Sequence, residues 1–380
     1  MRILVITPEQ LPVPPVTGGS VETNTYNIFR RMARTDRVVL LSRAHPRLPA
    51  VSSMVNGNLK IIRVPGGSRL RYIRAVLRKV RGQSFDVIQI ENRPTFVPHV
   101  RRMFPRTPII LSLHSLTFMA ALSTARANQI LRQVNGVTSV VAYVTHAMRR
   151  RFPRYAHKFR TAILGVDTDK FCPRTASYKR QLRRRWGVSG TFNVLFVGRI
   201  VRMKGLDTLV RAVALLKRRT PRIRLVAVGA SWPGVKRQTP YMRRVRLLSN
   251  RLGVPIRFTG YIPPASIHRM YHLGDVFVCP TRYREGFATV NSEAMASGVP
   301  VVASNRGGIR EVVQHGRSGL LVNRYTSPAA FAQAITRIRQ NPGLAKQLAH
   351  NGRRRVLSRF SWYYTVRWLK AQYALVRRRR

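Results

Sequence analysis

Acidic residues are scarce in this sequence. Its 380 residues include 12 Asp and Glu against 70 Lys and Arg, for a formal net charge of +58. So basic a chain attracts nucleic acid, anionic lipid and phosphorylated small molecules without selecting among them. A host whose proteins are generally rich in arginine also accounts for this composition, and both interpretations stay open. In either case, each remaining acid is expected to be needed where it stands.

Cysteines and long apolar runs are also scarce. The two cysteines, Cys172 and Cys279, offer no disulfide framework, which fits a reducing cytoplasm. The longest apolar runs fall far short of the ~20 residues that span a bilayer. The N-terminal run "RILVIT" has the length of a first β-strand rather than that of a signal peptide. No Cys/His cluster has zinc-like spacing and no paired-carboxylate motif stands out, so we expect no metal.

Short apolar runs alternate with helix-length segments along the chain. In the first half the expected strands are 2–7, 37–42, 59–65, 85–91, 108–114 and 137–145, and the clearest helices are about 21–33 and 69–82. After a polar segment at 164–176 the expected strands are 192–198, 223–229, 256–260, 276–280 and 300–304, with helices at about 206–218, 240–252, 264–273 and 289–297. This alternation predicts two doubly wound parallel α/β sheets with a cleft between domains. Ligands are expected beyond the carboxyl ends of the strands.

The loop after residue 198 is the first candidate for chemistry. In "NVLFVGRIVRMKGLDTLV", residues 193–210, Arg199 and Lys204 stand between a strand and a helix. Such a turn presents unpaired backbone N–H groups and the positive end of a helix dipole. Arg binds phosphate oxygens as a fork and Lys as a point charge. Because basic residues are everywhere in this chain, the strand–loop–helix context, rather than the charge, predicts a diphosphate site.

The stretch 285–302, "EGFATVNSEAMASGVPVV", contains two of the twelve acids and no basic residue. Glu285 is expected in a loop at the carboxyl edge of a sheet, and Glu293 about one turn into the helix at 289–297. The small residues after Glu285 let a ligand approach the backbone closely. A favourable contact with the helix dipole also accounts for Glu293, but it explains Glu285 less well.

Together these motifs resemble those of the family-4 retaining glycosyltransferases of the GT-B fold. The resemblance rests on Glu285 and Glu293 with seven residues between them, on the "GRIVRMKG" loop, on "GVDTDKF" at 165–171 and on "GG" after the first strand. It covers essentially the whole chain. "EQLPVPPVTGG" and "ENRPTFVP" are most similar to the spore-coat polysaccharide glycosyltransferase subgroup. The motifs are specific for the family and not for a sugar.

The resemblance implies two Rossmann-like domains that face a cleft. An acceptor-side domain is expected over residues 1–165, a hinge at 166–190 and a domain that binds the nucleotide-sugar over 191–357. A C-terminal helix within 358–380 is expected to cross back to the N-terminal domain, followed by a basic tail. Closure about the hinge would exclude water from the donor.

The resemblance also implies roles for individual residues. Glu285, His114, Arg199 and Lys204 are the expected catalytic residues. Glu285 contacts hydroxyls of the donor sugar, and Arg199 and Lys204 hold the diphosphate and offset its charge as it leaves. His114, which follows the strand "IILSL", lies near the donor sugar; a histidine that merely ends a strand is the alternative. Glu293 binds the ribose of the nucleotide.

Further donor-binding positions are implied in loops. Gly18 and Gly19 close over the donor phosphate and the acceptor, and Tyr261 and Ile262 lie beside the base. The remaining positions, which allow close approach or bind through backbone N–H groups, are Gly286, Phe287, Ala288 and Thr289.

Two features depart from the family pattern. Ala288 stands where the acid loop usually has glycine, which is tolerable unless the backbone φ is positive there. Glu91 precedes the "NRP" of the subgroup motif. It either reaches the acceptor side or forms an ion pair with Arg93, and we favour the ion pair.

The implied reaction is the transfer of a sugar, with retention of configuration, from a nucleotide-sugar to a glycan or lipid-linked acceptor. A UDP-sugar is the favoured donor, and envelope or spore-coat polysaccharide synthesis is the expected process. Front-face attack needs no enzymic nucleophile, since the departing phosphate accepts the acceptor's proton. We expect no cofactor and no metal, because Arg199 and Lys204 could do a metal's work on the diphosphate.

Two other classes of protein stay open at this point. One is a non-catalytic polyanion-binding or coat-structural protein, although such a protein has no need of Glu285 and Glu293. The other is a GT-B phosphorylase or glucan synthase, for which the chain is short. We expect a cytoplasmic protein without a specific nucleic-acid partner. The basic helix at 69–82, the segment 149–160 and the C-terminal tail could also dock on anionic lipid at the inner membrane face.

Overall fold

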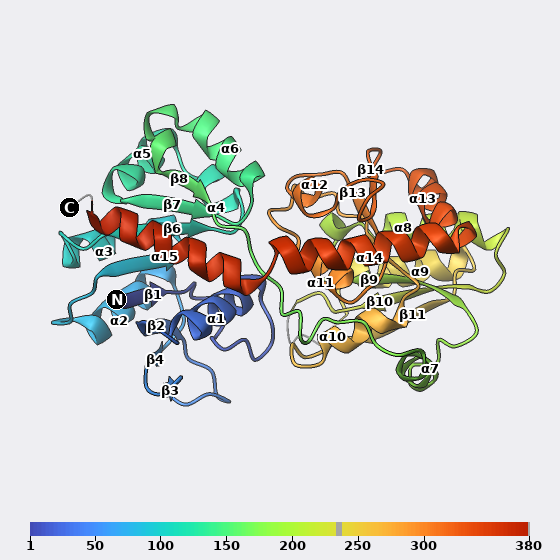
Figure 1. The fold of residues 1–380 in the computed structure, drawn as a ribbon, viewed down its shortest axis with the longest axis horizontal. Helices are drawn as coiled ribbons and strands as arrows, with labels where there is room; N and C mark the ends of the chain where they lie inside the picture. Colours follow the sequence, from blue (N-terminus) through green and yellow to red (C-terminus); the bar gives the residue numbers. More distant parts are fainter. Residues whose placement is uncertain (233–237, 379–380) are drawn as a thin grey trace. The chain divides into compact units, whose positions relative to one another are not determined.

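The computed structural model of the chain describes residues 1–232 and 238–378. The chain forms two compact units (Figure 1). Unit 1 contains residues Met1–Gly165 and Trp362–Arg380, and unit 2 contains Val166–Ser361. The unit boundaries differ from the expected domains in two places. The residues expected as a hinge, 166–190, belong to unit 2 and contain a helix, and the C-terminal helix begins at Trp362 rather than near 358.

Unit 1 is built on an eight-stranded sheet with the order β3-β4-β2-β1-β5-β6-β7-β8. The strands are β1 (Arg2–Ile6), β2 (Arg37–Arg43), β3 (Val51–Met54), β4 (Leu59–Val64), β5 (Val87–Glu91), β6 (Ile109–Leu113), β7 (Gly136–Ser139) and β8 (Phe159–Thr161). All neighbours are parallel except β3 and β4, which form an antiparallel edge. Ile3, Leu4, Val5 and Ile6 are fully buried, as expected for a parallel strand that helices cover on both faces.

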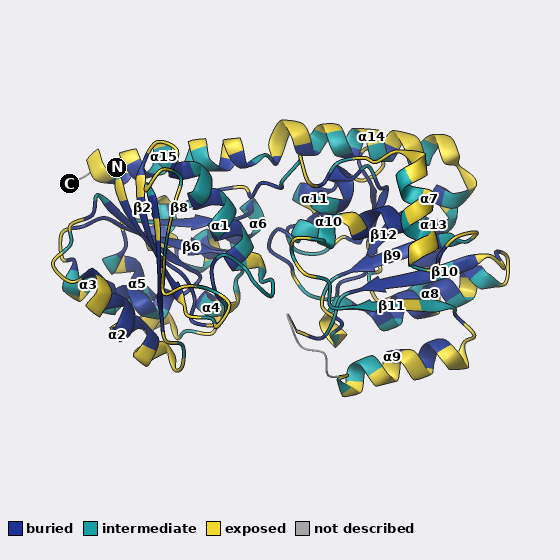
Figure 2. Ribbon diagram, turned by 90° about the horizontal axis from the view of Figure 1, so that it is seen from below, coloured by how far each residue is buried: buried dark blue, intermediate teal, exposed yellow. Residues whose placement is uncertain are grey.

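Helices cover the sheet of unit 1 on two sides (Figure 2). They are α1 (Ser20–Met32), α2 (Arg69–Val80), α3 (Val97–Met103), α4 (Thr117–Ala120), α5 (Thr124–Gln133), α6 (Ala142–Arg151) and α15 (Trp362–Arg378), with 3₁₀ turns η1 (Pro94–Phe96) and η2 (Pro153–Lys158). Helix α15 packs against α1 through an apolar face that includes Trp362, Leu369, Tyr373 and Val376. Its Lys370 also forms an ion pair with Asp36 at 2.8 Å. The last helix is therefore part of the N-terminal unit's core.

Unit 2 has a six-stranded, all-parallel sheet with the order β11-β10-β9-β12-β13-β14. The strands are β9 (Phe192–Val197), β10 (Ile223–Val228), β11 (Ile256–Gly260), β12 (Val276–Cys279), β13 (Val301–Ser304) and β14 (Leu320–Val322). The helices are α7 (Ala176–Arg185), α8 (Leu206–Lys217), α9 (Pro240–Arg251), α10 (Ile267–Met270), α11 (Thr289–Ala296), α12 (Ile309–Val312), α13 (Pro328–Gln340) and α14 (Pro342–Arg359), with 3₁₀ turns η3 (Arg202–Lys204) and η4 (Tyr271–Leu273).

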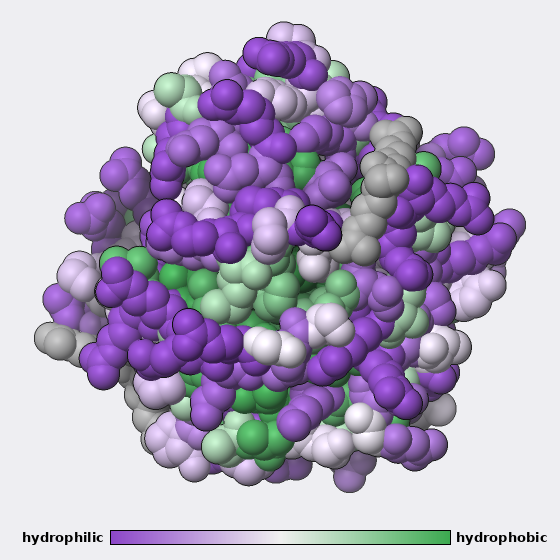
Figure 3. Space-filling model, turned by 90° about the vertical axis from the view of Figure 1, so that its left-hand side faces the viewer, coloured by the Kyte–Doolittle hydropathy of each residue, from purple (hydrophilic) through white to green (hydrophobic). Residues whose placement is uncertain are grey.

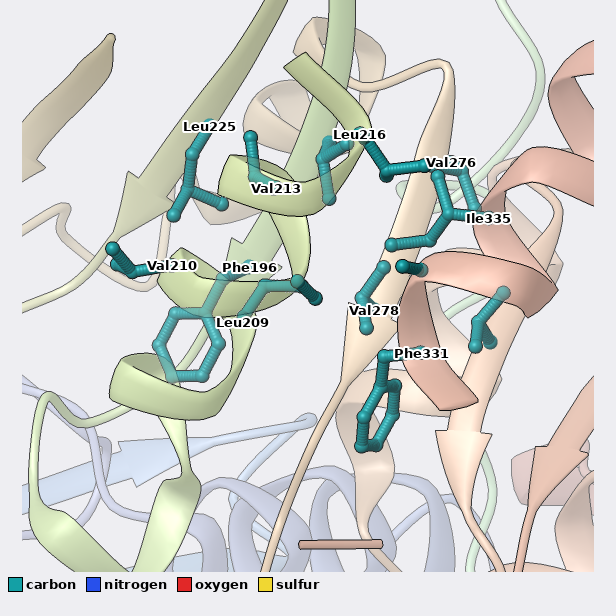
Figure 4. Close-up of a cluster of buried hydrophobic side chains, with 14 of the residues drawn as sticks. Phe196, Leu209, Val210, Val213, Leu216, Leu225, Val276, Val278, Phe331 and Ile335 are labelled. Carbon is teal, nitrogen blue, oxygen red and sulfur yellow. The ribbon is translucent and has the colours of Figure 1, made fainter. Parts of the chain in front are cut away.

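A buried apolar cluster joins the sheet of unit 2 to helices α8 and α13 (Figure 4). Leu209 and Val213 from α8 and Phe331 and Ile335 from α13 are all fully buried beside Val278 of β12. The apolar residues recur at helical spacing on α8 and α13, which is why each helix lays one face on the sheet. This packing fixes the start of α8 relative to the strand ends, and so fixes the loop that precedes it.

In both sheets the strand order reverses at one point. In unit 1 the reversal lies between β1 and β5, and in unit 2 it lies between β9 and β12. Doubly wound sheets bind ligands beyond the carboxyl ends of their strands at such a switch point. The fold therefore directs attention to the loops after β1 and β5 in unit 1 and after β9 and β12 in unit 2.

Two predicted elements differ from what the structure shows, and the short strands β3, β8 and β14 were not predicted. The strand expected at 137–145 ends at Ser139, and α6 begins at Ala142. Val140, Val141 and Val144 are buried, and a buried helix start looks like a strand when only apolar residues are counted. The helix expected at 264–273 is divided into the short α10 and the 3₁₀ turn η4.

The surface reflects the composition. Figure 3 shows one face of the molecule, on which hydrophilic side chains dominate and smaller hydrophobic areas lie between them. On the outer face of α2, Arg71, Arg74, Arg78 and Lys79 are exposed, while Tyr72 and Val76 on its inner face are fully buried. None of the helices in the described part of the chain is long and apolar enough to cross a membrane.

Candidate functional site

The loops after β9 and β12 meet at the switch point of unit 2. Between β9 and α8 the chain passes through Arg199 and the 3₁₀ turn that contains Lys204. Gly205 then adopts a left-handed conformation with φ of 71°, and a Cβ atom there would lie 2.0 Å from the carbonyl oxygen of Pro280. Only glycine allows this approach, so the backbones of the two loops are in direct contact.

An ion pair connects the two loops. Lys204 Nζ lies 2.5 Å from Glu285 Oε1, and the hydroxyl of Thr281 donates to the same oxygen at 3.0 Å. The Glu285 side chain is 12% exposed and that of Lys204 is 23% exposed. The partner of Glu285 therefore lies 81 residues earlier in the chain, which is why no basic residue accompanies this acid in its own stretch.

A second ion pair between the same loops involves residues that the sequence did not single out. Asp207, at the start of α8, accepts from Arg282 Nη2 at 2.8 Å and from the Tyr241 hydroxyl at 2.7 Å. Although burial raises the pKa of Asp207, these two hydrogen bonds outweigh it and hold that pKa below its usual range. The scarcity of acids was the only signal that could have pointed to Asp207.

Arg199 is placed differently from Lys204. Its side chain is exposed, and its guanidinium lies over the ring of Trp232 at 5.2 Å from the centroid. A planar cation stacked on an aromatic ring is held in orientation while its N–H donors stay available. Arg199 and Lys204 thus both stand at the carboxyl end of β9, as predicted.

Glu293 lies in the second turn of α11, as expected, and it has no cationic partner within reach of a hydrogen bond among the described residues. The hydroxyl of the fully buried Tyr271 donates to Glu293 Oε2 at 2.6 Å. Burial raises the pKa of Glu293 to about 7, which outweighs the opposite effect of that hydrogen bond. The carboxyl group therefore changes its charge near neutral pH.

The segment that joins Glu285 to α11 has an unusual backbone. Gly286 and Phe287 are buried, and Ala288 adopts φ of 52° and ψ of 64° directly before Thr289, the first residue of α11. The condition that made alanine tolerable at this position, a negative φ, is therefore not met. A non-glycine residue in the left-handed region is strained, and this turn lies directly before the first N–H groups of α11, which have no partner within the helix.

Tyr261 and Ile262 follow β11, which is two strands away from β9 in the sheet order. Both residues are half-buried. They follow the carboxyl end of a strand in the same sheet as β9 and β12, but they are not in the loops that contain Arg199 and Glu285.

Unit 1 has its own group of polar residues at its switch point. Arg93 donates to Glu9 through Nε at 2.6 Å and through Nη2 at 3.1 Å, and the Phe118 ring lies 4.3 Å from its guanidinium carbon. Although burial raises the pKa of Glu9, the hydrogen bond from Arg93 holds it below its usual range. The expected ion pair between Glu91 and Arg93 is wrong, because Arg93 pairs with Glu9.

Glu91 instead contacts His114. Its Oε2 atom lies 2.9 Å from His114 Nε2, and Gln89 Nε2 donates to its other oxygen at 2.5 Å. Gly18 and Gly19 have φ of 106° and 113°, and a Cβ atom on Gly19 would lie 2.3 Å from Glu22 Oε2. Burial raises the pKa of Glu22 to about 7. The glycine pair, Glu22, Glu91 and His114 thus belong to unit 1, and Arg199, Lys204, Glu285 and Glu293 to unit 2.

The described residues contain no group of three or more His, Cys, Asp or Glu side chains that could hold a metal ion. Several ionisable groups at both switch points are arranged in pairs, namely Glu9 with Arg93, Glu91 with His114, Lys204 with Glu285 and Asp207 with Arg282. Such pairs can hold phosphate and hydroxyl groups through charge-assisted hydrogen bonds.

Two family models match this chain. The model "Glycosyltransferase Family 4" matches residues 17–170, and the model "Glycosyl transferases group 1" matches residues 179–355. The first therefore lies mainly in unit 1 and the second in unit 2.

The chain is also similar to curated proteins over nearly its full length. It is 29% identical to spore coat protein SA of Bacillus subtilis over 95% of this chain and 96% of that protein. It is likewise 29% identical to the putative glycosyltransferase YtcC of the same organism, over 99% of this chain and 92% of that protein. A third relative, the GDP-mannose-dependent alpha-(1-6)-phosphatidylinositol monomannoside mannosyltransferase of Mycobacterium tuberculosis, is 34% identical over 62% of each chain.

Solved structures share the fold. The sucrose-phosphate synthase of Thermosynechococcus elongatus matches with a TM-score of 0.83 at 24% identity, over 99% of this chain and 98% of that one. Anabaena HepE in complex with UDP matches with a TM-score of 0.80 at 20% identity, over 98% and 100%. These likenesses confirm the predicted GT-B fold. The two family models, which together match residues 17–170 and 179–355, show that the chain belongs to the family-4 and group-1 glycosyltransferases and is an enzyme of the hexosyltransferase class.

Proposed function

We propose that this enzyme transfers a sugar, with retention of configuration, from a nucleotide-sugar to a glycan or lipid-linked acceptor. A UDP-sugar is the favoured donor, and envelope or spore-coat polysaccharide synthesis is the favoured process. The observation that carries the proposal is the Lys204–Glu285 pair, which joins the loops after β9 and β12 at the switch point of unit 2.

The geometry of this pair supports distinct roles for its members. Among the described residues, Lys204 and Thr281 both contact Oε1 of Glu285, so Oε2 is left for a hydroxyl group of the donor sugar. Lys204 is partly exposed and has further N–H donors for a phosphate oxygen. Arg199, held by Trp232, offers a second cation to the same diphosphate.

In the proposed mechanism the chain's residues position the substrates and stabilise charge. Arg199 and Lys204 hold the diphosphate and offset the charge that develops as it leaves, and the backbone N–H groups of residues 287–289 add to this. Glu293 accepts from the ribose hydroxyls, Tyr261 and Ile262 lie beside the base, and Gly286 gives the donor room near the backbone. Gly18, Gly19 and His114 act from unit 1 on the donor phosphate and sugar. No metal or other cofactor is needed in this scheme.

Relatives and neighbours lend support of different kinds. The HepE structures are complexes with UDP and with UDP-glucose, and one curated relative is a spore coat protein. Another relative uses GDP-mannose, so the base remains the point to test. A non-catalytic polyanion-binding protein is not favoured, because such a protein gains nothing from acids that are tied into the loops at the switch point.

The proposal also places the protein in the cytoplasm, in peripheral contact with the inner membrane face. The exposed cations on α2 support contact with anionic lipid. Cosedimentation with phosphatidylglycerol vesicles at moderate salt tests this contact, and a protein that ignores such vesicles rules it out.

The donor site is tested by thermal unfolding with UDP-, GDP- and ADP-sugars at moderate salt. A ligand at 100 times its dissociation constant adds roughly 2.7 kcal/mol to the free energy of unfolding. We expect one nucleotide class to stabilise the wild type and E293A to lose most of that shift. The control is D169A, which removes an exposed acid in the same unit and raises the net charge equally.

The pH dependence of this shift sharpens the test. Because burial raises the pKa of Glu293 to about 7, the carboxylate that accepts from the ribose is present above neutral pH and is lost as the pH falls through 7. The wild-type shift should therefore be larger at pH 8 than at pH 6, and E293A should lack this difference. If all nucleotides act alike and E293A binds them as well as the wild type, the proposed donor site is wrong.

A further inference from the structure

A chain of buried hydrogen bonds in unit 1 leads from the C-terminal helix to His114. The hydroxyl of Tyr373, in α15, donates to Gln89 Oε1. Gln89 Nε2 donates to Glu91 Oε1 at 2.5 Å, and Glu91 Oε2 lies 2.9 Å from His114 Nε2. Gln89 and Glu91 are alternate residues of β5, so their side chains leave the same face of the sheet. Tyr373 is fully buried, and Gln89 and Glu91 are each 1% exposed.

The chemistry of these groups fixes the direction of each hydrogen bond. A phenol has one proton, and in donating it to Gln89 the Tyr373 hydroxyl orients that amide with its NH₂ group toward Glu91. An ionised carboxylate can only accept, so the proton in the bond to His114 must be on Nε2. A neutral His114 is therefore held as the Nε2–H tautomer, with the lone pair of Nδ1 left unshared.

Nδ1 of His114 is the open end of this chain. The atom is buried and has no hydrogen-bond partner among the described residues. His114 follows β6 directly, and its backbone N–H donates to Asn92 Oδ1 at 3.3 Å. Asn92 has φ of 53°, a conformation that is costly unless the surroundings impose it. Both the ring and the backbone of His114 are thus held at the carboxyl edge of the sheet.

A purely structural explanation accounts poorly for this arrangement. Burying a carboxylate, an imidazole and an amide costs free energy even when they are paired, and apolar residues of similar size often stabilise a core more. The chain has only 12 acids in 380 residues, yet one of them, Glu91, is buried in the sheet. There it does not offset the positive charge of the surface. Both the cost of burying Glu91 and the use of a scarce acid are explained if Glu91 holds the His114 ring in one tautomer and one orientation.

We propose that Glu91 is a positioning residue that acts through His114. It fixes the Nε2–H tautomer and the ring orientation, so that Nδ1 accepts a hydrogen bond from a hydroxyl group of the bound sugar. Gln89 and Tyr373 hold Glu91 in turn, which makes α15 a support for the site in unit 1. This inference rests on the proposed function, in which His114 contacts the donor sugar.

The test combines kinetics with a spectroscopic readout on the enzyme as it exists. The variants are E91M, which removes the acceptor, E91Q, which replaces the oxygen that faces His114 with an NH₂ group, and Y373F. In protein with ¹⁵N-labelled histidine, the H114Q spectrum identifies the His114 signals. We expect the wild type to show a protonated Nε2 and an unprotonated Nδ1 at pH 8, and E91M to show a mixture of tautomers. E91Q should favour the Nδ1–H tautomer, because its amide oxygen accepts from Gln89 and its NH₂ group then donates to His114 Nε2.

The kinetic expectation follows the same order. Loss of a residue that orients a catalytic histidine reduces turnover by about tenfold to a hundredfold or more. We expect E91M and E91Q to lose kcat on that scale with little change in donor KM, and Y373F to lose a few-fold. Y364F is the matched control, because Tyr364 is on the same helix and is 47% exposed; it should retain wild-type kcat.

The effect of the negative charge of Glu91 must be distinguished from the effect of its contact with His114. Glu22 and Arg93 are charged groups near His114 and Glu91, and Asp36 is near Tyr373. E22Q removes a buried acid without breaking the contact between Glu91 and His114. The His114 tautomer should be unchanged in E22Q. An unchanged tautomer in E91M, or the same mixture in E22Q, would overturn the inference.

Failure of the inference and failure of the proposed function give different results. If H114Q is inactive while E91M and E91Q keep wild-type kcat, Glu91 does not position His114 and the proposed function stands. If H114Q keeps wild-type kcat, His114 has no catalytic contact, and both this inference and that part of the proposed function are overturned. Should E91M fail to fold, E91Q and Y373F still decide the matter through the tautomer and kcat.

Discussion

Both sheets have one point at which the strand order reverses, but the ion pairs at their carboxyl edges differ in how far solvent reaches them. In unit 1 the Glu9–Arg93 pair has side chains that are 8% and 2% exposed. In unit 2 the Lys204 and Arg282 side chains, which pair with Glu285 and Asp207, are 23% and 24% exposed. A pair that is sealed in the core is expected to serve the fold, whereas a pair that solvent reaches can exchange a partner for a ligand.

In unit 2 the Lys204–Glu285 pair connects two loops, and in unit 1 the Glu9–Arg93 pair does the same. Lys204 and Glu285 belong to the loops after β9 and β12, and the contact between Gly205 and Pro280 brings those loops together. In unit 1, Gln89 and Glu91 are residues of β5 itself and cannot move without the strand. The two edges therefore differ in what their charged side chains can do. Those of unit 2 are partly exposed and can change partners, so we call this the adjustable edge. Those of unit 1 are buried and keep their partners, so we call this the fixed edge.

The largest expected effect comes from breaking the reachable pair. K204M removes the cation that Glu285 and the donor diphosphate share, and removal of one electrostatic stabiliser typically costs on the order of 10²–10³ in rate. We expect kcat/KM to fall by that amount. The free energy of unfolding should change by no more than about 1 kcal/mol, because a partly exposed pair contributes little to stability. Sugar-transfer kinetics and urea unfolding measure the two quantities.

K346M is the control for this variant, since Lys346 is an exposed lysine of α14 in the same unit. It should match the wild type in both measurements. A K204M enzyme with normal kcat/KM and a large loss of stability would reverse the comparison, because the pair would then serve the fold.

The sealed pair should behave in the opposite way. R93M removes the buried partner of Glu9 and leaves it only the exposed Arg69 at 3.6 Å, and breaking a buried pair from one side costs about 3–5 kcal/mol. We expect urea unfolding to report a loss on that scale, while the stabilisation that the nucleotide-sugar adds to unit 2 persists. R69M is the matched control: Arg69 lies 3.6 Å from Glu9, but its side chain is 55% exposed, so its loss should cost less than about 1 kcal/mol.

If R93M abolished nucleotide binding at an unchanged stability, the buried pair would belong to the ligand site and the division between the two edges would be wrong. Equal losses in R93M and R69M would show that burial does not set the strength of the contact with Glu9.

The sequence predicts most of the strands, because apolar runs of strand length leave little choice in a parallel sheet, but it misses the short β3, β8 and β14. It also places Arg199, Lys204, Glu285 and Glu293 after the correct strands. It does not predict their partners, since Lys204 and Glu285 are 81 residues apart. The Glu91–Arg93 pair is a reasonable expectation for a strand, where residues two apart share a face. Asn92 breaks that rule with φ of 53°, which turns Arg93 away toward Glu9.

The smallest expected effect concerns the backbone of the adjustable edge. Ala288 is held with φ of 52°, and an L-residue pays roughly 1–2 kcal/mol in the left-handed region. Glycine removes that strain but loses more conformational entropy on folding, by about 0.5–1 kcal/mol. A288G should therefore stabilise the protein by up to about 1 kcal/mol, seen as a higher urea midpoint with an unchanged slope.

The reverse substitution, glycine to alanine at a residue with positive φ, can be made at Gly187. It has φ of 65°, and a Cβ atom there would meet nothing within 4 Å, so G187A introduces the same strain without a steric clash. We expect G187A to destabilise by about the amount that A288G stabilises. If A288G destabilises the protein while G187A behaves as expected, the Ala288 methyl group makes contacts that outweigh its backbone strain. The loop that carries Glu285 would then be held by packing, and unit 2 would have a fixed edge like that of unit 1.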